Sequence, residues 1–101
     1  MQLIPRKVML SNQPNEFVFE GFWWFYDARP DPWKEGKPDW KLYPDNKSVF
    51  IDFRFNKWLK SGKKKEFSRI MVTPVHMIDF STMMQVNVYD QKKQRPVKRG
   101  K

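Results

Sequence analysis

The sequence predicts an α+β domain in which β-sheet dominates. Seventeen of its 101 residues are aromatic, eight are valine, and Ala28 is the only alanine. Aromatic and β-branched side chains suit the half-buried surface of a sheet, whereas helical bundles draw mainly on alanine and leucine. A chain of this length forms one domain. We therefore expect a single core built mostly from strands and filled with large rings.

The chain begins with a predicted extension over residues 1–15, because Pro5 and the sequence SNQPN interrupt any regular element. The first strand is expected within residues 16–28. In its second half Phe22, Trp24 and Tyr26 face one side of the strand. Trp23 and Phe25 face the other.

A loop and a short strand are expected next. Three prolines and one glycine mark residues 29–39 as the loop, and residues 40–44 form a strand that Pro44 ends. Residues 61–67, with a glycine and three lysines, read as a solvated loop. Three or four further strands follow at residues 67–73, 76–80, 85–90 and 95–99.

Residues 45–62 fit two patterns. Alternating apolar residues up to Phe55 would suit a strand, whereas Ile51, Phe55 and Trp58 fall on one helical face at i, i+4 and i+7. Capping-type residues near the start of this segment and Gly62 at its end favour a helix.

The net positive charge lies in the second half of the chain. Residues 1–50 hold seven Lys/Arg and seven Asp/Glu, whereas residues 51–101 hold thirteen and four, so the whole net charge of +9 lies there. This asymmetry suggests a polyanionic partner such as nucleic acid, a phosphorylated ligand or anionic lipid. Solubility alone is the other interpretation.

Several function classes are excluded by composition. The absence of cysteine rules out disulfides, thiolate zinc sites and cysteine catalysis. His76 and Asp79 form the only acid–base pair in view, without a partnered nucleophile or recognisable metal-ligand spacing. We therefore expect no catalysis and no cofactor.

The compartment follows from the same kind of reasoning. No apolar run approaches the roughly 18 residues of a membrane span, and the first ten residues do not resemble a secretory signal. We expect an intracellular protein, nuclear or cytoplasmic, that does not use a membrane.

Four motifs together resemble the WWE domain. They are WFYDAR followed by Trp40, then SVFIDFRF, IDFSTMMQVN and RPVKR, in the family's order over residues 20–99. Trp24 and Trp40 match the two tryptophans of the family's name, and Asp52 stands where the glutamate belongs.

The family is found in ubiquitin ligases and poly(ADP-ribose) polymerases. The resemblance implies a small half-open antiparallel β-barrel of about six strands, closed by one helix at about residues 48–60. It also implies a single domain over residues 16–99, with a basic tail at residues 100–101.

The resemblance further implies a ligand. WWE domains typically bind the iso-ADP-ribose unit of poly(ADP-ribose), or terminal ADP-ribose, in a pocket at one end of the barrel. An adenine needs a flat apolar partner and an amide for its edge, and phosphates favour arginine. The residues that match the family's binding positions, or could assist them, are Tyr26, Arg29, Trp40, His76, Gln85, Arg95, Lys98 and Arg99.

Among these residues, Gln85 is expected to reach the adenine or its ribose, and Arg95 the phosphates. His76 replaces a tyrosine that pocket-forming members carry nine residues before the glutamine. A neutral histidine can donate one hydrogen bond, and a protonated one would favour a phosphate. The expected partners are poly(ADP-ribose) or ADP-ribosylated proteins, with protein partners as a further class, for a monomeric domain.

Whether Gln85 and Arg95 share a face depends on the register of the last two strands. If Tyr89 pairs with Arg95, Gln85 pairs with Arg99, and both Gln85 and Arg95 lie on one face. A slip of one residue would place Arg95 among valines, where its burial is costly. We therefore predict the first register.

Two other functions remain open on the sequence. The domain could be a protein-interaction module in which the pocket is vestigial and exposed aromatic residues dock a partner. It could also bind single-stranded nucleic acid through its rings and lysines.

Overall fold

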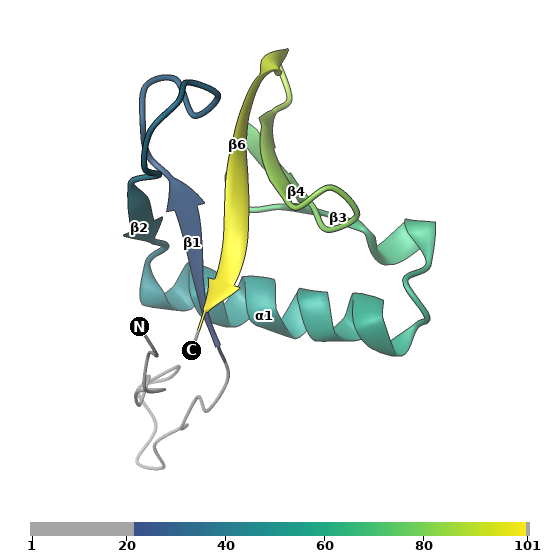
Figure 1. Ribbon diagram of the computed structural model, residues 1–101. Coiled ribbons are helices and arrows are strands. Elements are labelled where there is room, and N and C mark those ends of the chain that lie inside the picture. Colours follow the sequence, from purple (N-terminus) through teal and green to yellow (C-terminus); the bar gives the residue numbers. More distant parts are fainter. Residues whose placement is uncertain (1–21, 101) are drawn as a thin grey trace.

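The computed structural model describes residues 22–100 and contains one sheet and one long helix (Figure 1). All six strands are antiparallel to their neighbours, in the order β2-β1-β6-β5-β4-β3, and the sheet is not closed. The elements are β1 (Trp23–Asp27), β2 (Trp40–Leu42), α1 (Asp45–Lys60), the 3-10 turn η1 (Lys65–Phe67), β3 (Arg69–Met71), β4 (His76–Asp79), β5 (Met84–Asn87) and β6 (Asp90–Gly100). The predicted half-open barrel with one helix is confirmed.

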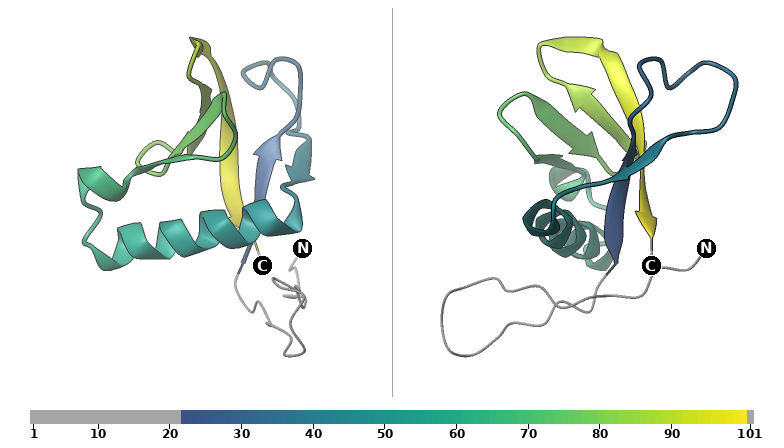
Figure 2. Two further views of the ribbon diagram at one scale, coloured as in Figure 1. Left: turned by 180° about the vertical axis from the view of Figure 1, so that it is seen from behind. Right: turned by 90° about the vertical axis from the view of Figure 1, so that its left-hand side faces the viewer.

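The helix lies at one end of the sheet, and the β1–β2 loop and the β5–β6 hairpin lie at the other. In Figures 1 and 2, α1 crosses the sheet at the end where β1 begins and β6 ends. The β1–β2 loop and the β5–β6 hairpin project together at the other end. Residues far apart in the sequence therefore meet at the mouth of the half-open barrel.

The ambiguous segment is a helix. It begins at Asp45, three residues before the predicted start, with Pro44 at the N-cap position and no side-chain cap. Ser48 is fully buried and does not cap the helix. Its hydroxyl accepts a hydrogen bond from the backbone N–H of Trp24 and donates one to the backbone carbonyl of Tyr43. Gly62 has a φ of +80° just past the end of the helix, as a helix-ending glycine should.

Several predicted strand boundaries were wrong, and two of the strands differ most. The strand expected over residues 67–73 is reduced to Arg69–Met71, since η1 uses the residues before it. The last strand begins at Asp90 and not at residue 95. Of the first predicted strand, Trp23–Asp27 is seen, and residues 1–21 and 101 lie outside the described residues. The predicted domain bounds stay a prediction.

Large rings fill the core, as expected. Trp24, Ile51 and Ile78 are completely buried, and Phe80 is almost so. The ring centroids of Trp24 and Phe55 lie 5.0 Å apart, nearly edge to face, and Phe80 contacts both rings. Trp24 is therefore a core residue.

Asp52 joins the helix to the sheet. This carboxylate is 2 % exposed; it accepts a hydrogen bond from Trp24 Nε1 at 3.0 Å and one from Arg99 Nε at 2.8 Å. The Arg99 guanidinium also lies 3.9 Å from the centroid of the Phe22 ring. Aspartate therefore connects α1 to both β1 and β6 from the position where the family carries glutamate.

We expect Asp52→Ala to lower the free energy of unfolding by about 2–4 kcal/mol, because it leaves the Trp24 indole and the Arg99 guanidinium without their buried acceptor. Urea denaturation followed by tryptophan fluorescence measures this. Asp52→Asn keeps an oxygen for Trp24 and should lose about half as much. Glu66→Ala, at an exposed position, is the control. A loss no greater than that of Glu66→Ala would contradict the role.

Candidate functional site

Two neighbouring cavities open at the mouth of the barrel. The first, which we call the inner cavity, has a volume of about 490 Å³ and lies between β1, the start of α1 and the turn before β4. The second, the outer cavity, has about 510 Å³ and lies between the β1–β2 loop and the β5–β6 hairpin. Both volumes are typical of small-molecule sites. His76, Gln85 and Arg95 line both cavities.

Gln85 and Arg95 are direct partners across β5 and β6. Directly opposed residues in an antiparallel pair project from the same face, so the predicted sharing of a face is confirmed. The predicted register was wrong, because Arg95 pairs with Gln85 and not with Tyr89. The error of four residues is even and therefore leaves the face unchanged.

The physical reason for the different register is an irregularity in β6. Asn87 pairs with Asp90 and closes the hairpin by accepting the backbone N–H groups of Tyr89 and Asp90 on its side-chain oxygen. The ladder then shifts, so that Val86 pairs with Gln94. Such bulges are not visible in an alternating pattern.

Tyr43 holds the Gln85 side chain in place. Its hydroxyl donates to Gln85 Oε1 at 2.5 Å, and its ring packs on Tyr26 with the centroids 4.9 Å apart. Burial raises the pKa of the Tyr43 hydroxyl well above its usual range, and the nearby Tyr26 adds to the effect. The phenol therefore stays protonated and remains a donor.

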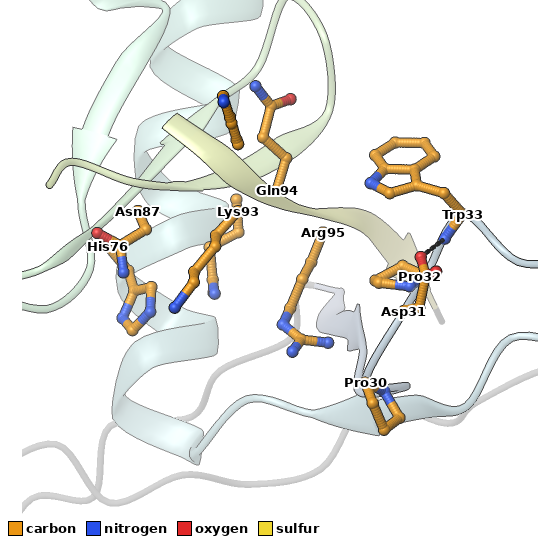
Figure 3. A pocket seen from close by; sticks show the side chains of 11 residues that line it. Pro30, Asp31, Pro32, Trp33, His76, Asn87, Lys93, Gln94 and Arg95 are labelled. Atoms are coloured by element: carbon orange, nitrogen blue, oxygen red, sulfur yellow. Dashed lines mark hydrogen bonds between the residues drawn. The ribbon is translucent and has the colours of Figure 1, made fainter. Parts of the chain in front are cut away.

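Two backbone carbonyls position the Arg95 guanidinium. Its Nη1 donates to the carbonyl of Asp27 at 2.9 Å and to that of Arg29. Within residues 22–100, Nε and Nη2 of Arg95 have no such partner, so several donors of its fork remain available. Figure 3 shows that the Arg95 guanidinium projects into the outer cavity.

His76 and Lys47 complete the polar lining of the inner cavity. His76 Nδ1 lies 2.9 Å from the Thr73 hydroxyl oxygen. The same oxygen accepts a hydrogen bond from the backbone N–H of His76. Lys47 Nζ donates to the Val72 carbonyl from the first turn of α1. Both side chains are partly exposed.

The other four predicted site residues lie outside both cavities: Arg29, Trp40, Lys98 and Arg99. Arg99 is engaged by Asp52 at the helix end of the sheet. Lys98 Nζ lies 4.6 Å from the centroid of the Trp40 ring, on the opposite face of β6 from Arg95 and Arg99. That any of these four residues contacts a ligand stays a prediction.

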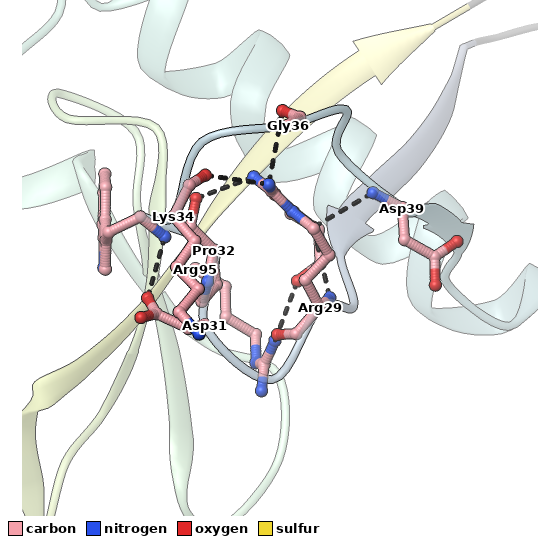
Figure 4. Close-up of polar contacts among 9 residues, drawn as sticks. Arg29, Asp31, Pro32, Lys34, Gly36, Asp39 and Arg95 are labelled. Carbon is pink, nitrogen blue, oxygen red and sulfur yellow. Dashed lines mark hydrogen bonds and ion pairs between the residues drawn. The ribbon is translucent and has the colours of Figure 1, made fainter.

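Arg29 organises the β1–β2 loop (Figure 4). It donates to both carboxylate oxygens of Asp27, with the shortest contact at 2.8 Å. Its Nη groups also donate to the carbonyls of Pro32, Lys34 and Gly36. The loop is therefore wrapped around one guanidinium.

Asp27 is 1 % exposed and is the carboxylate that neutralises Arg29. The side-chain hydrogen bond from Arg29 lowers the pKa of Asp27 from 3.8 to about 2, although burial acts in the opposite direction. The backbone N–H groups of Arg29 and Asp39 add to the lowering.

Sequence reasoning missed Tyr43 and Lys47. Alternation over residues 40–44 predicts that Lys41 and Tyr43 point to the same side of the chain, and Lys47 follows Tyr43 by four residues. This spacing could have indicated both residues. Among residues 22–100, no group of three or more histidine, aspartate or glutamate side chains could hold a metal ion.

These features define a half-open β-barrel with a cationic hollow at its mouth, the architecture of a binding module. The family model of the WWE domain matches residues 20–99, so the chain belongs to the WWE domain family and the resemblance is confirmed. Domains of this family are binding modules associated with ubiquitin and ADP-ribosylation, and are not known as catalysts. No curated protein and no solved structure matches the chain.

In the described part of the chain, no helix is both long and apolar enough to cross a membrane.

The ionised Asp27 should stabilise the fold above pH 3.8, and this stabilisation should be lost as the pH falls through about 2. We expect Asp27→Asn to lower the free energy of unfolding at pH 6, with about 1–2 kcal/mol of the loss due to the carboxylate charge. The difference in the free energy of unfolding between this variant and the unmodified protein should shrink as the pH falls toward 2. Thermal unfolding followed by circular dichroism over this pH range measures it, with Glu66→Gln as the exposed control. A difference that does not change with pH would contradict the assignment.

Proposed function

We propose that the inner cavity binds one ADP-ribose unit without catalysis, either the iso-ADP-ribose unit of poly(ADP-ribose) or terminal ADP-ribose. The observation that carries this proposal is the pairing of Gln85 with Arg95, which aims an amide and a guanidinium at one cavity. The proposed partners are poly(ADP-ribose) itself and proteins that carry it.

The amide of Gln85 suits an adenine edge. Its Oε1 accepts the Tyr43 hydroxyl and keeps a second lone pair for the exocyclic amino group of adenine. Its Nε2 has no partner among residues 22–100 and is available to donate to a ring nitrogen. The ring of Tyr26 lines the same cavity and offers the flat apolar surface on which a base stacks.

The charges of the inner cavity suit a diphosphate. Arg95, Lys41 and Lys47 line it together with His76, and no carboxylate in residues 22–100 does so. Hydrogen bonds between a guanidinium and a phosphate contribute about 1.5–3 kcal/mol each. A ligand that carries phosphates close to a base therefore matches the amide and the cations that line the cavity together.

Titration calorimetry with iso-ADP-ribose, ADP-ribose and a short single-stranded oligonucleotide tests the proposal. We expect saturable one-to-one binding of at least one of the two ADP-ribose compounds. Affinity that grows with oligonucleotide length and collapses in moderate salt would indicate a nucleic-acid binder instead. No heat with any of the three would leave a protein-interaction module.

Two substitutions should weaken that binding. Gln85→Ala removes the amide and should raise the Kd about 5- to 150-fold, and Arg95→Ala should raise it about 10- to 150-fold. Gln91→Ala and Arg69→Ala are the matched controls, because both residues are exposed and line neither cavity. Circular dichroism checks that each variant is folded. Equal affinity of Gln85→Ala and Gln91→Ala would overturn the adenine assignment.

The hydroxyl of Tyr43 has a separate, smaller expected effect. Tyr43→Phe keeps the ring but no longer holds Gln85 Oε1, so the Kd should rise about 2- to 10-fold. Calorimetry on this variant alone and combined with Gln85→Ala gives a double-mutant cycle. Because the hydroxyl acts through the amide, the second substitution should add almost nothing to the first. Additive losses would show that Tyr43 contacts the ligand by itself.

A further inference from the structure

The outer cavity continues the inner one along the face of the hairpin. His76, Gln85 and Arg95 line both, so a ligand seated on Gln85 and Arg95 has open space on both sides of them. We propose that the outer cavity is a second subsite, which takes the unit of poly(ADP-ribose) adjoining the one in the inner cavity. This inference rests on the proposed function and adds a preference for polymer over a single unit.

The hairpin supplies the cations of this second subsite. Lys92 and Lys93 both line the outer cavity. They lie in the part of β6 that the register shift leaves without partners in β5, so their side chains need not alternate as in a regular strand. The Lys92 N–H donates to an Asp90 side-chain oxygen, and Gln94 Nε2 donates to the Gln91 carbonyl, so the bulge is braced.

The loop contributes one carboxylate to the same cavity. Asp31 lines it, but its Oδ1 accepts the backbone N–H of Trp33 at 3.1 Å. Three cations, Lys92, Lys93 and Arg95, therefore oppose one carboxylate that already serves the loop. An ADP-ribose polymer adds two phosphates with every unit, and this excess of positive charge matches them.

The loop also supplies a ring. Trp33 lines the outer cavity and is 59 % exposed. Its position is set by the neighbouring contacts of Arg29 with the carbonyls of Pro32 and Lys34 (Figure 4). A tryptophan held in solvent by a braced loop is a surface on which a second base can stack with little further loss of conformational freedom.

The two sides of the cavity face each other across Arg95. In Figure 3 the Pro30–Trp33 segment lies on one side of this residue, and His76 and Lys93 lie on the other. A polymer leaving the inner cavity past Arg95 would therefore meet phosphate-binding and base-stacking groups together. A single unit confined to the inner cavity would contact neither Trp33 nor the two lysines.

The test compares iso-ADP-ribose with a purified two-unit fragment of poly(ADP-ribose) by titration calorimetry at one salt concentration. We expect the fragment to bind about tenfold or more tightly than the single unit, beyond the factor of about two that two equivalent binding units would give. Trp33→Ala and the double variant Lys92→Ala/Lys93→Ala should each remove most of this gain. They should leave the affinity for iso-ADP-ribose within about twofold.

Two matched variants control for ring and charge. Tyr89→Ala removes a ring that is 81 % exposed at the tip of the same hairpin, and Lys63→Ala/Lys64→Ala removes the same charge after α1. Both should keep the gain from the second unit. If the fragment gains no more than the statistical factor, or if Tyr89→Ala and Trp33→Ala behave alike, the second subsite is overturned while the inner site stands.

Other outcomes separate the two proposals. Absence of binding by both iso-ADP-ribose and the fragment overturns the proposed function and the second subsite together. A fragment that binds while neither iso-ADP-ribose nor ADP-ribose does, with full dependence on Gln85, would show that no single unit is bound independently and would overturn the two-subsite description. A single-stranded oligonucleotide that binds as tightly as the fragment, with the same loss in Trp33→Ala, would assign the outer cavity to nucleic acid.

Discussion

One strand, β6, sets the geometry on which the fold and the cavities depend. It is hydrogen-bonded to β1 on one side and to β5 on the other, and thereby joins the two halves of the sheet. Near its end Arg99 binds the buried Asp52 of the helix, and near its middle Arg95 binds the carbonyls of Asp27 and Arg29. Because both guanidiniums project from one strand, the register that closes the core also fixes the direction of Arg95.

The charges of the domain divide into two groups with different tasks. Asp27 and Asp52 are almost fully buried, and each is paired with an arginine, so these charges cancel inside the fold. Among residues 22–100, no carboxylate forms an ion pair with Lys92 and Lys93 of the hairpin or with Lys47 of the first turn of α1. Cations that no buried carboxylate neutralises therefore line the two cavities at the mouth of the barrel.

The amino-acid pattern was sufficient for much of the fold. A chain rich in rings and valine, with one alanine, forms a sheet with a ring-filled core, and the i, i+4, i+7 spacing of Ile51, Phe55 and Trp58 is realised in α1. Short strands were placed less well than the helix, because a strand is defined by its partners. The 3-10 turn before Arg69 and the early start of β6 rest on short-range hydrogen bonds, which the alternation of apolar residues does not reveal.

For the candidate site, strand alternation and the cost of burying an arginine among valines were enough to predict that Gln85 and Arg95 share a face, and the error of four residues in the register left that face unchanged. Only the tertiary structure decided which residues surround them. It brought Tyr43 to the Gln85 amide from the short link between β2 and α1, paired Arg99 with Asp52, and turned Trp40 toward Lys98. Side-chain direction follows from local geometry and can be read from alternation, whereas the neighbours of a side chain follow from packing between distant segments.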